Sequence, residues 1–466
     1  MARLFGTDGV RGVANTELTC DLAFKLGQAA AVFLGGSIVI GKDTRLSGDM
    51  LEASAAAGIM SAGGTALLAG VIPTPGVALL VRELHADGGI VISASHNPPE
   101  YNGIKLFDAQ GYKLPDEVED RIEAFVAAGG IASETSSDDI ALPAGDHVGV
   151  AVSVDEAIEI YVNHAVDSVR SQGIDFSGMH IALDAGHGAS ALTSAAAFER
   201  LGARVSVIND DFNGVDINVE CGSTHLEPLR ALLEESGADI GVAHDGDADR
   251  VMLMTPDGFE IDGDFVEAVC ALDMRNRGVL RRDTVVSTVM CNLGFVRAME
   301  ANGIDVVQTA VGDRYVLEEM RAQGYSIGGE QSGHMILLDH NTTGDGLMTA
   351  CQFIAAVIRS GASVSEAVKV MERYPQALVN VRVRDKHALA GNEAVRSEIA
   401  AVETELGDTG RVLVRTSGTE PLVRVMVEAS DAQVADEAAR RIAAVVASCR
   451  RGSLERSVSK GKEERW

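Results

Sequence analysis

Short apolar strands alternate with helices over most of this 466-residue chain, and this alternation constrains the fold more than any other feature. Strands are expected at residues 39–40, 66–71 and 89–93, with helices at residues 51–59 and 77–84 between them. Such alternation is typical of a mainly parallel sheet covered by helices on both faces. The first part of the chain is therefore predicted to be an α/β domain.

The same alternation occurs twice more along the chain. Residues 129–149 are rich in Ser, Asp and Gly and lack periodicity, which indicates a boundary. Beyond them we expect strands at 180–183, 204–208 and 240–243, and helices at 191–201, 226–236, 263–275 and 344–359.

The pattern changes after residue 376. Strands at 379–383, 412–414 and 422–427 and helices at 393–406 and 432–448 predict a smaller α+β domain. The predicted division of the chain is an α/β domain 1 (1–148), an α/β domain 2 (149–251), an α/β domain 3 (252–373), an α+β domain 4 (374–449) and a charged, mobile tail (450–466).

The composition excludes some classes of partner. A formal net charge of −29 disfavours nucleic acid and anionic membranes. Residues 53–81 carry no charge, but Gly and Pro interrupt them, so a helix, a strand and a second helix fit better than a membrane span.

The start of the chain lacks a signal-peptide pattern, and we expect a cytoplasmic protein. The six cysteines form no CxxC pair and are predicted to be buried hydrophobes in a reducing compartment.

Ser95 follows the predicted strand 89–93 in a polar turn that Pro98 closes. Open α/β sheets place their chemistry at the carboxyl ends of strands. An ordinary turn serine is the alternative for this segment alone.

Asp245, Asp247 and Asp249 follow the strand 240–243 at a spacing of two residues, so their carboxylates can converge on a hard cation. An EF-hand would need Gly and Glu where the chain has Arg250 and Pro256. A solvated acidic turn is the other alternative.

Three further polar loops carry weaker signals. Residues 415–421, with Arg424 beyond, form either an anion-binding nest or a plain hairpin turn. Residues 328–334 offer groups suited to sugar hydroxyls, and His334 is either a general acid or base or a structural histidine. Residues 5–12 form a Gly-rich turn with one arginine.

Taken together, these loops resemble the α-D-phosphohexomutase superfamily over residues 1–449. The matching segments, in order, are FGTDGVRG, SASHNPPEYNGIK, DGDADR, GGEQSGH and RTSGTEP. Three further segments resemble those of the bacterial branch that acts on glucosamine phosphates. They are CGSTH at 221–225, VGDRY at 311–315 and TTGDG at 342–346. The resemblance implies four domains around a central cleft, of which three are α/β and the last is α+β.

The resemblance also implies roles for single residues. Ser95 would be a phosphoserine that donates and recovers a phosphoryl group, and its phosphate would hold one Mg²⁺ per subunit together with Asp245, Asp247 and Asp249. The other implied roles are sugar binding by Glu330 and Ser332, phosphate binding by Arg415, Ser417, Gly418, Thr419 and Arg424, and a reacting centre lined by Arg11, His96, Lys105, Arg250 and His334, with the acid and base unassigned.

The implied reaction interconverts glucosamine 6-phosphate and glucosamine 1-phosphate through a sugar 1,6-bisphosphate, which is also an activator, and it would supply UDP-N-acetylglucosamine and cell-wall synthesis. A homodimer is expected on the same ground. The alternatives are a phosphomannomutase/phosphoglucomutase, a phosphatase, and a non-catalytic sugar-phosphate or Ca²⁺-binding protein.

Two segments depart from the family pattern. Tyr101 stands where many relatives have Asp, and we expect a shifted loop with its chemistry intact. The family's DxANGA turn is DAGHGA at residues 184–189. We expect this turn to be remote from the proposed chemistry.

Overall fold

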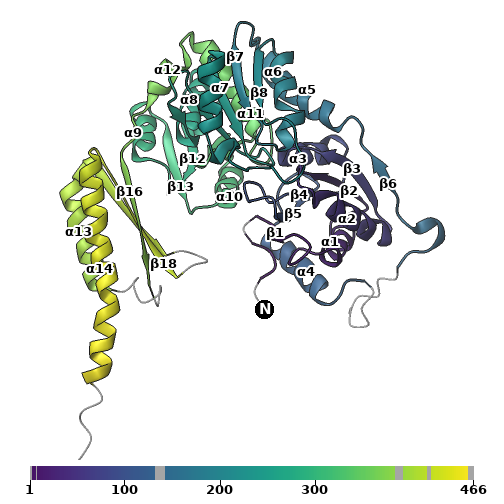
Figure 1. The fold of residues 1–466 in the computed structure, drawn as a ribbon, viewed down its shortest axis with the longest axis horizontal. Coiled ribbons are helices and arrows are strands. Elements are labelled where there is room, and N and C mark those ends of the chain that lie inside the picture. The colour runs from purple at the N-terminus through teal and green to yellow at the C-terminus, as the bar shows by residue number, and fades with distance from the viewer. Residues whose placement is uncertain (1–2, 7, 132–141, 384–391, 417–420, 460–466) are drawn as a thin grey trace, which may run out of the picture. The chain divides into compact units, whose positions relative to one another are not determined.

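The computed structural model describes residues 3–6, 8–131, 142–383, 392–416 and 421–459. The chain divides into two compact units. Met1–Cys291 and Met299–Val370 form the first unit, and Asn292–Ala298 and Met371–Trp466 form the second. Figure 1 labels many of the elements of both units.

The first sheet of the first unit is mixed. Its strand order is β1-β5-β4-β2-β3-β6, in which β4, β2, β3 and β6 are parallel and β5 is antiparallel to both β4 and β1. Helices α1 and α2 pack together and lie with α4 over one hydrophobic core. The elements are β1 (Val10–Val13), α1 (Cys20–Phe33), β2 (Ser37–Lys42), α2 (Gly48–Ser61), β3 (Thr65–Val71), α3 (Thr74–Glu83), β4 (Gly88–Ile92), β5 (Tyr101–Asp108), α4 (Asp116–Ala127) and β6 (Ala151–Ser153).

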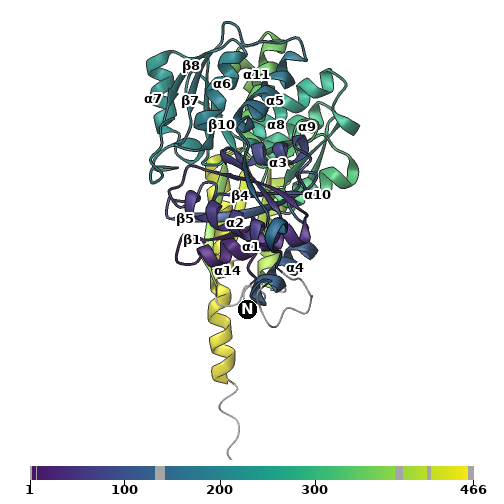
Figure 2. The ribbon, with the colours of Figure 1, turned by 90° about the vertical axis from the view of Figure 1, so that its right-hand side faces the viewer.

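The second sheet has the order β11-β10-β9-β7-β8. Strands β7, β8 and β9 are parallel, and β10 turns back antiparallel to β9. Helix α6 packs on β8 and α7 packs on β7 (Figure 2). The elements are α5 (Ala157–Arg170), β7 (His180–Asp184), α6 (Ser194–Arg200), β8 (Arg204–Ile208), α7 (Glu227–Ser236), β9 (Ile240–His244), β10 (Val251–Met254) and β11 (Glu260–Ile261).

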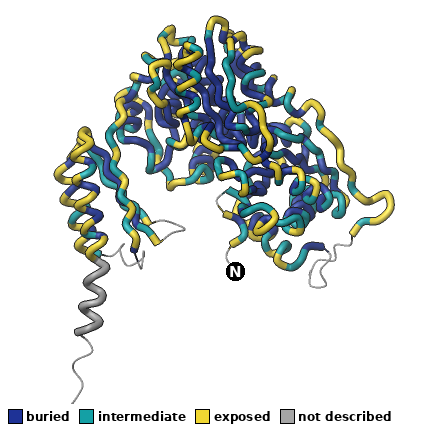
Figure 3. The backbone as a smooth tube through the Cα atoms, in the orientation of Figure 1, coloured by how far each residue is buried: buried dark blue, intermediate teal, exposed yellow. Residues whose placement is uncertain are grey.

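The third sheet has the order β13-β12-β14-β15, with β15 antiparallel to β14. The central strands β4, β7, β9 and β12 are buried along their whole lengths (Figure 3). The elements are α8 (Gly263–Asn276), β12 (Thr284–Thr288), α9 (Leu293–Ala301), β13 (Asp305–Thr309), α10 (Asp313–Gln323), β14 (Ile327–Gly329), β15 (Met335–Leu337), α11 (Gly346–Ser360) and α12 (Val364–Ala367).

The second unit is built on a three-stranded antiparallel sheet of order β16-β18-β17. Helices α13 and α14 pack on it around a core of their own. Besides most of α9, its elements are β16 (Gln376–Arg382), α13 (Glu393–Leu406), β17 (Gly410–Thr416), β18 (Leu422–Ala429) and α14 (Ala432–Ser459).

The predicted fold class is confirmed, since three α/β sheets precede a smaller α+β unit. Several elements differ from the expectation, among them helices α4, α5, α9 and α10 and strands β1, β12 and β13, which were not predicted. Strand β5 was not predicted, because burial on both faces removes the alternation that marks a strand. Helix α1 was also missed. Helix α14 continues to Ser459 through the expected tail, of which residues 460–466 lie outside the described residues.

Residues 53–81 form the end of α2, strand β3 and most of α3, as expected. Within the described parts of the chain, no single helix has the length and apolarity to cross a membrane, although the pair Gly346–Ser360 and Val364–Val370, bent by 92°, meets both criteria jointly. Five cysteines are free thiols, of which Cys20 is half-buried and the other four are buried. The side chain of Cys449 lies outside the description.

Candidate active site

Ser95 lies in a buried turn directly after β4. Its backbone is left-handed, with a φ of 53°, which is uncommon for a residue other than glycine. The side chain is almost completely buried, and its Oγ donates a hydrogen bond of 2.7 Å to Oδ2 of Asp245. The turn therefore directs the serine hydroxyl at the acidic loop of the second sheet.

That acidic loop connects β9 to β10. Asp245, Asp247 and Asp249 each offer a carboxylate oxygen within 4.8 Å of the others, and all three residues are buried. Within the described structure, Oδ1 of Asp247 and Oδ1 of Asp249 are buried without a hydrogen-bond partner. Buried oxygens without partners are costly unless a cation coordinates them, so this donor set fits a hard divalent ion.

The pKa of Asp245 shows the same need for positive charge. Burial, followed by the neighbouring carboxylates of Asp249 and Asp247, raises it to about 8. Burial also favours the neutral form of Asp249, but Lys105 and His334 outweigh burial and lower its pKa. The three carboxylates thus repel one another, and a bound cation would relieve that repulsion.

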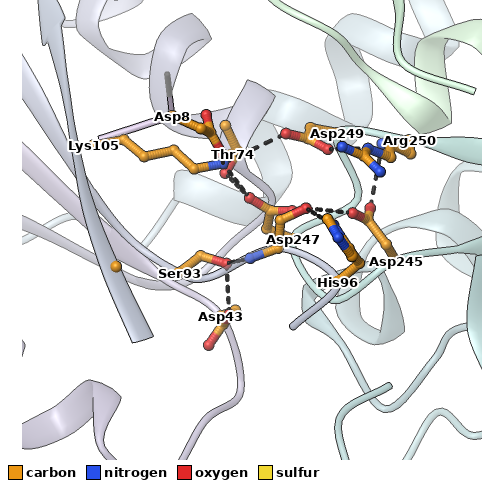
Figure 4. A network of polar contacts seen from close by, with 12 residues as sticks. Asp8, Asp43, Thr74, Ser93, His96, Lys105, Asp245, Asp247, Asp249 and Arg250 are labelled. Carbon is orange, nitrogen blue, oxygen red and sulfur yellow. Dashed lines mark hydrogen bonds and ion pairs between the residues drawn. The ribbon is translucent and has the colours of Figure 1, made fainter. Parts of the chain in front are cut away.

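Lys105 is the central cation of the site and comes from the antiparallel strand β5. Its buried ammonium lies 2.9 Å from Asp247, 3.0 Å from Asp8 and 3.5 Å from Asp249 (Figure 4). Burial alone would lower the pKa of Lys105, but these carboxylates raise it well above its usual value. Lys105 therefore carries its charge at every physiological pH.

Asp8 also belongs to the site, although it was not among the predicted site residues and lies in the FGTDGVRG segment. Its carboxylate joins Lys105, Arg11 and Lys113, and Lys113 also pairs with Asp313. These cations overcome the effect of burial and hold the pKa of Asp8 well below its usual range. Asp8 could have been predicted from the sequence, because it is the acidic residue of a Gly-rich turn. The sequence around Lys113 carries no comparable signal.

Two of the predicted residues, Arg250 and His334, border the carboxylates, and His96 borders the Ser95 hydroxyl. Arg250 Nε lies 3.8 Å from Oδ1 of Asp249, and His334 Nδ1 lies 3.7 Å from the same oxygen. His96 Nδ1 lies 3.5 Å from the Ser95 hydroxyl, and burial together with Arg250 lowers the pKa of His96. Burial would also lower the pKa of His334, but Asp249 outweighs burial and raises it.

The predicted sugar loop lies between β14 and β15. Glu330 is half-buried, and its Oε1 accepts a 3.1 Å hydrogen bond from the backbone of Gly312, whereas Ser332 is exposed. The backbone of Glu330 donates to the carbonyl of His334, which closes the loop.

The predicted phosphate loop belongs to the second unit. Arg415 and Arg424 are direct cross-strand partners on β17 and β18. Burial and then Arg424 lower the pKa of Arg415, because two opposed guanidinium groups repel each other. This pair suits an anion. Ser417, Gly418 and Thr419 lie outside the described residues.

The expectation that the DAGHGA turn is remote from the site is wrong. The backbone of Ala189 donates a 2.9 Å hydrogen bond to the carbonyl of Gly246, inside the acidic loop. A Cβ on Gly188 would lie 2.6 Å from that same carbonyl oxygen. The two turns meet because β7 and β9 are adjacent parallel strands whose carboxyl ends share one edge.

Comparison with known proteins assigns the chain to a family. Four models of phosphoglucomutase/phosphomannomutase domains match it: alpha/beta/alpha domain I at residues 2–131, domain II at 159–258, domain III at 262–374 and the C-terminal domain at 378–445. A phosphoglucosamine mutase of Clostridium novyi is 48% identical over 453 residues, which cover 96% of this chain and 99% of the relative. The chain belongs to the phosphoglucosamine mutase family.

Solved structures agree with this membership at the level of the fold. A phosphoglucomutase/phosphomannomutase family protein of Burkholderia thailandensis matches with a TM-score of 0.78 at 23% identity, covering 96% of this chain and 97% of that protein. N-acetylphosphoglucosamine mutase of Aspergillus fumigatus, solved with GlcNAc-6P and magnesium, matches with a TM-score of 0.68 at 16% identity, covering 96% of both chains. These solved structures therefore share the fold of this chain.

Proposed function

We propose that this enzyme interconverts glucosamine 6-phosphate and glucosamine 1-phosphate through a phosphoserine at Ser95 and a 1,6-bisphosphate intermediate. The observation that carries the proposal is the 2.7 Å hydrogen bond between the buried Ser95 hydroxyl and Asp245 of the carboxylate triad. A phosphate on Ser95 would lie beside the oxygens that suit a divalent cation. The full-length similarity to phosphoglucosamine mutases supports glucosamine phosphate as the sugar.

Asp245, Asp247 and Asp249 fit Mg²⁺, because they supply clustered, buried, anionic oxygen ligands. When bound with the phosphoserine, the ion supplies charge neutralisation for phosphoryl transfer. The chain adds its own cations. Three carboxylates and a phosphate of about −2 leave a deficit near −3 after one divalent ion, and Lys105, Arg250 and Arg11 offset it.

The reaction conserves phosphoryl groups. The bond between Ser95 Oγ and phosphorus breaks, a bond between phosphorus and the sugar O1 forms, and the O1 proton passes to a base in the site. His96 and His334 are the candidates for this base. After the bisphosphate has turned end over end, the bond between phosphorus and O6 breaks, a bond between phosphorus and Ser95 Oγ forms, and O6 takes up a proton from an acid in the site, which leaves glucosamine 1-phosphate. Arg415 and Arg424 would bind the phosphate that is not reacting.

Phosphopeptide mapping and an assay with three sugars test the proposal. Incubation with ³²P-labelled glucosamine 1,6-bisphosphate should label Ser95, and Ser95→Ala should lose both the label and turnover. Ser153→Ala, which changes an exposed serine on the edge strand β6, should keep both. Near-normal turnover in Ser95→Ala would refute the phosphoserine.

The same assay decides the sugar. Glucosamine 6-phosphate should exceed glucose and mannose 6-phosphates in kcat/KM. The reverse order would favour a phosphomannomutase/phosphoglucomutase, and release of free phosphate without isomerisation would indicate a phosphatase.

A further inference from the structure

Arg45 lies just after the carboxyl end of β2, and its side chain is completely buried. Burying a guanidinium is costly unless its hydrogen bonds are replaced. Here the replacement is complete. Nε donates to Asp43, Nη1 donates to the carbonyls of Pro98 and Tyr101, and Nη2 donates to those of Ser95 and Asn97.

These bonds use all five N–H donors of the guanidinium, and four of them end on the backbone of the turn that carries Ser95. The turn therefore closes around one side chain. The fifth donor binds Asp43, whose carboxylate also accepts a 2.6 Å hydrogen bond from the Ser93 hydroxyl. The oxygen of that hydroxyl in turn accepts a hydrogen bond from the backbone N–H of Ser95. Figure 4 shows the contact between Asp43 and Ser93.

The carbonyl of Ser95 is held from a second side. Nδ2 of Asn218 donates to it at 2.9 Å, beside the 2.9 Å bond from Arg45. A carbonyl oxygen has two lone pairs, and both are used here. Gly246 of the acidic loop packs closely against this hydrogen bond. A Cβ on Gly246 would lie 2.8 Å from the carbonyl oxygen of Ser95 and 2.9 Å from Nδ2 of Asn218.

We propose that Arg45 and Asn218 are positioning residues, which fix the carbonyl of Ser95 and thereby hold its hydroxyl toward Asp245. This inference rests on the proposed role of Ser95 as the phosphoryl carrier. The left-handed φ of 53° at Ser95 costs free energy, and it persists only where surrounding bonds enforce it. The Arg45 clamp supplies these bonds, and Asn218 joins them to the loop of the second sheet.

Lysine cannot replace Arg45 in this role, because an ammonium has three donors and no planar fork. Arg45→Lys keeps the charge beside Asp43 but removes donors from the backbone carbonyls of the turn. Asn218→Gly removes the second bond to the carbonyl of Ser95 and a 3.3 Å bond to the carbonyl of Asn97, and glycine tolerates the φ of 60° at this position. Arg82→Lys is the matched control, since Arg82 is a partly buried arginine that donates to Oδ1 of Asn341 and to the carbonyls of Ala78 and His340.

The experiment measures kcat and KM for glucosamine 6-phosphate and, in a single turnover, the transfer of ³²P from phosphorylated enzyme to sugar. A displacement of about 1 Å at a reacting group can cost on the order of 10²-fold in rate. We expect a loss of kcat of that size in Arg45→Lys and of about 10-fold in Asn218→Gly, with KM within about twofold of wild type in both. Arg82→Lys should match wild type. Amide hydrogen exchange across residues 95–101 should accelerate in both test variants.

Each outcome has a defined meaning. Wild-type kcat in Arg45→Lys would overturn the inference, and so would losses that only follow the fraction of unfolded protein. If Arg45→Lys does not fold, a wild-type kcat in Asn218→Gly would overturn it and a reduced kcat with unchanged KM would support it. Retained turnover in Ser95→Ala would instead overturn the proposed function and, with it, the role of the clamp.

Discussion

The hydroxyl of Ser95 lies 2.7 Å from a carboxylate oxygen of Asp245, although 150 residues separate them along the chain. Each residue follows the carboxyl end of a buried strand, β4 for Ser95 and β9 for Asp245, and the strands belong to different sheets. Two such edges facing each other create a site that neither sheet has alone.

Removing one carboxylate of the triad should weaken the binding of divalent cations. In Asp247→Asn, one of the three anionic ligands becomes neutral. We expect the Mg²⁺ affinity, measured by isothermal titration calorimetry, to fall by at least the roughly 10–100-fold that is typical of losing even an outer-sphere partner. Asp146→Asn, which changes a carboxylate that is 95% exposed, should bind as wild type does. Equal affinities in the two variants would exclude the triad as the metal site.

Lys105→Met should separate metal binding from catalysis. The substitution leaves Asp8, Asp247 and Asp249 buried without their shared cation, which should cost about 3–5 kcal/mol of unfolding free energy in the absence of metal. It also removes a competing positive charge, so Mg²⁺ should bind more tightly than in wild type and restore part of the lost stability. Turnover should be lost. Weaker Mg²⁺ binding in this variant would contradict the prediction.

Glu267→Gln should change how stability depends on pH. Glu267 is buried on α8 with its Oε1 lacking a hydrogen-bond partner in the described structure, and burial followed by Asp264 raises its pKa well above 4.5. Above pH 4.5 the native state thus binds a proton that the unfolded state has released, so this group lowers stability progressively as pH rises toward its native pKa.

Glu267→Gln lacks the titrating carboxyl group, so this pH-dependent loss of stability is absent from the variant. Denaturant unfolding at pH 5, 6, 7 and 8 should show the stability of Glu267→Gln rising relative to wild type with increasing pH. A constant difference across the four values would show that Glu267 is not proton-linked to folding.

Gly188→Ala should disturb the acidic loop through packing alone. The new Cβ would lie 2.6 Å from the carbonyl oxygen of Gly246 and 2.8 Å from its Cα, and backbone atoms cannot give way as side chains do. We expect a loss of about 1–3 kcal/mol in unfolding free energy and weaker Mg²⁺ binding. Gly36→Ala, where a Cβ would meet nothing within 4 Å, should leave both quantities near wild type. Equal unfolding free energies and Mg²⁺ affinities in the two variants would show that the contact with the DAGHGA turn does not constrain the acidic loop.

Local patterns determined the fold class and the identity of the reactive loops. Alternation of strands and helices predicted three α/β sheets and an α+β unit, because apolar periodicity reports which face of each element is buried. The turns at Ser95 and Asp245 were also visible locally, since polar residues after a buried strand mark the edge where open sheets place their chemistry.

Only the tertiary structure decided which distant groups meet. Strand β5 delivers Lys105 to the triad, and Lys113 and Arg45 reach the site from loops that no sequence pattern singled out. The DAGHGA turn proved to border the acidic loop for the same reason. Hydrogen bonds and ion pairs between residues far apart in the chain depend on strand order and register, which the spacing of apolar residues does not encode.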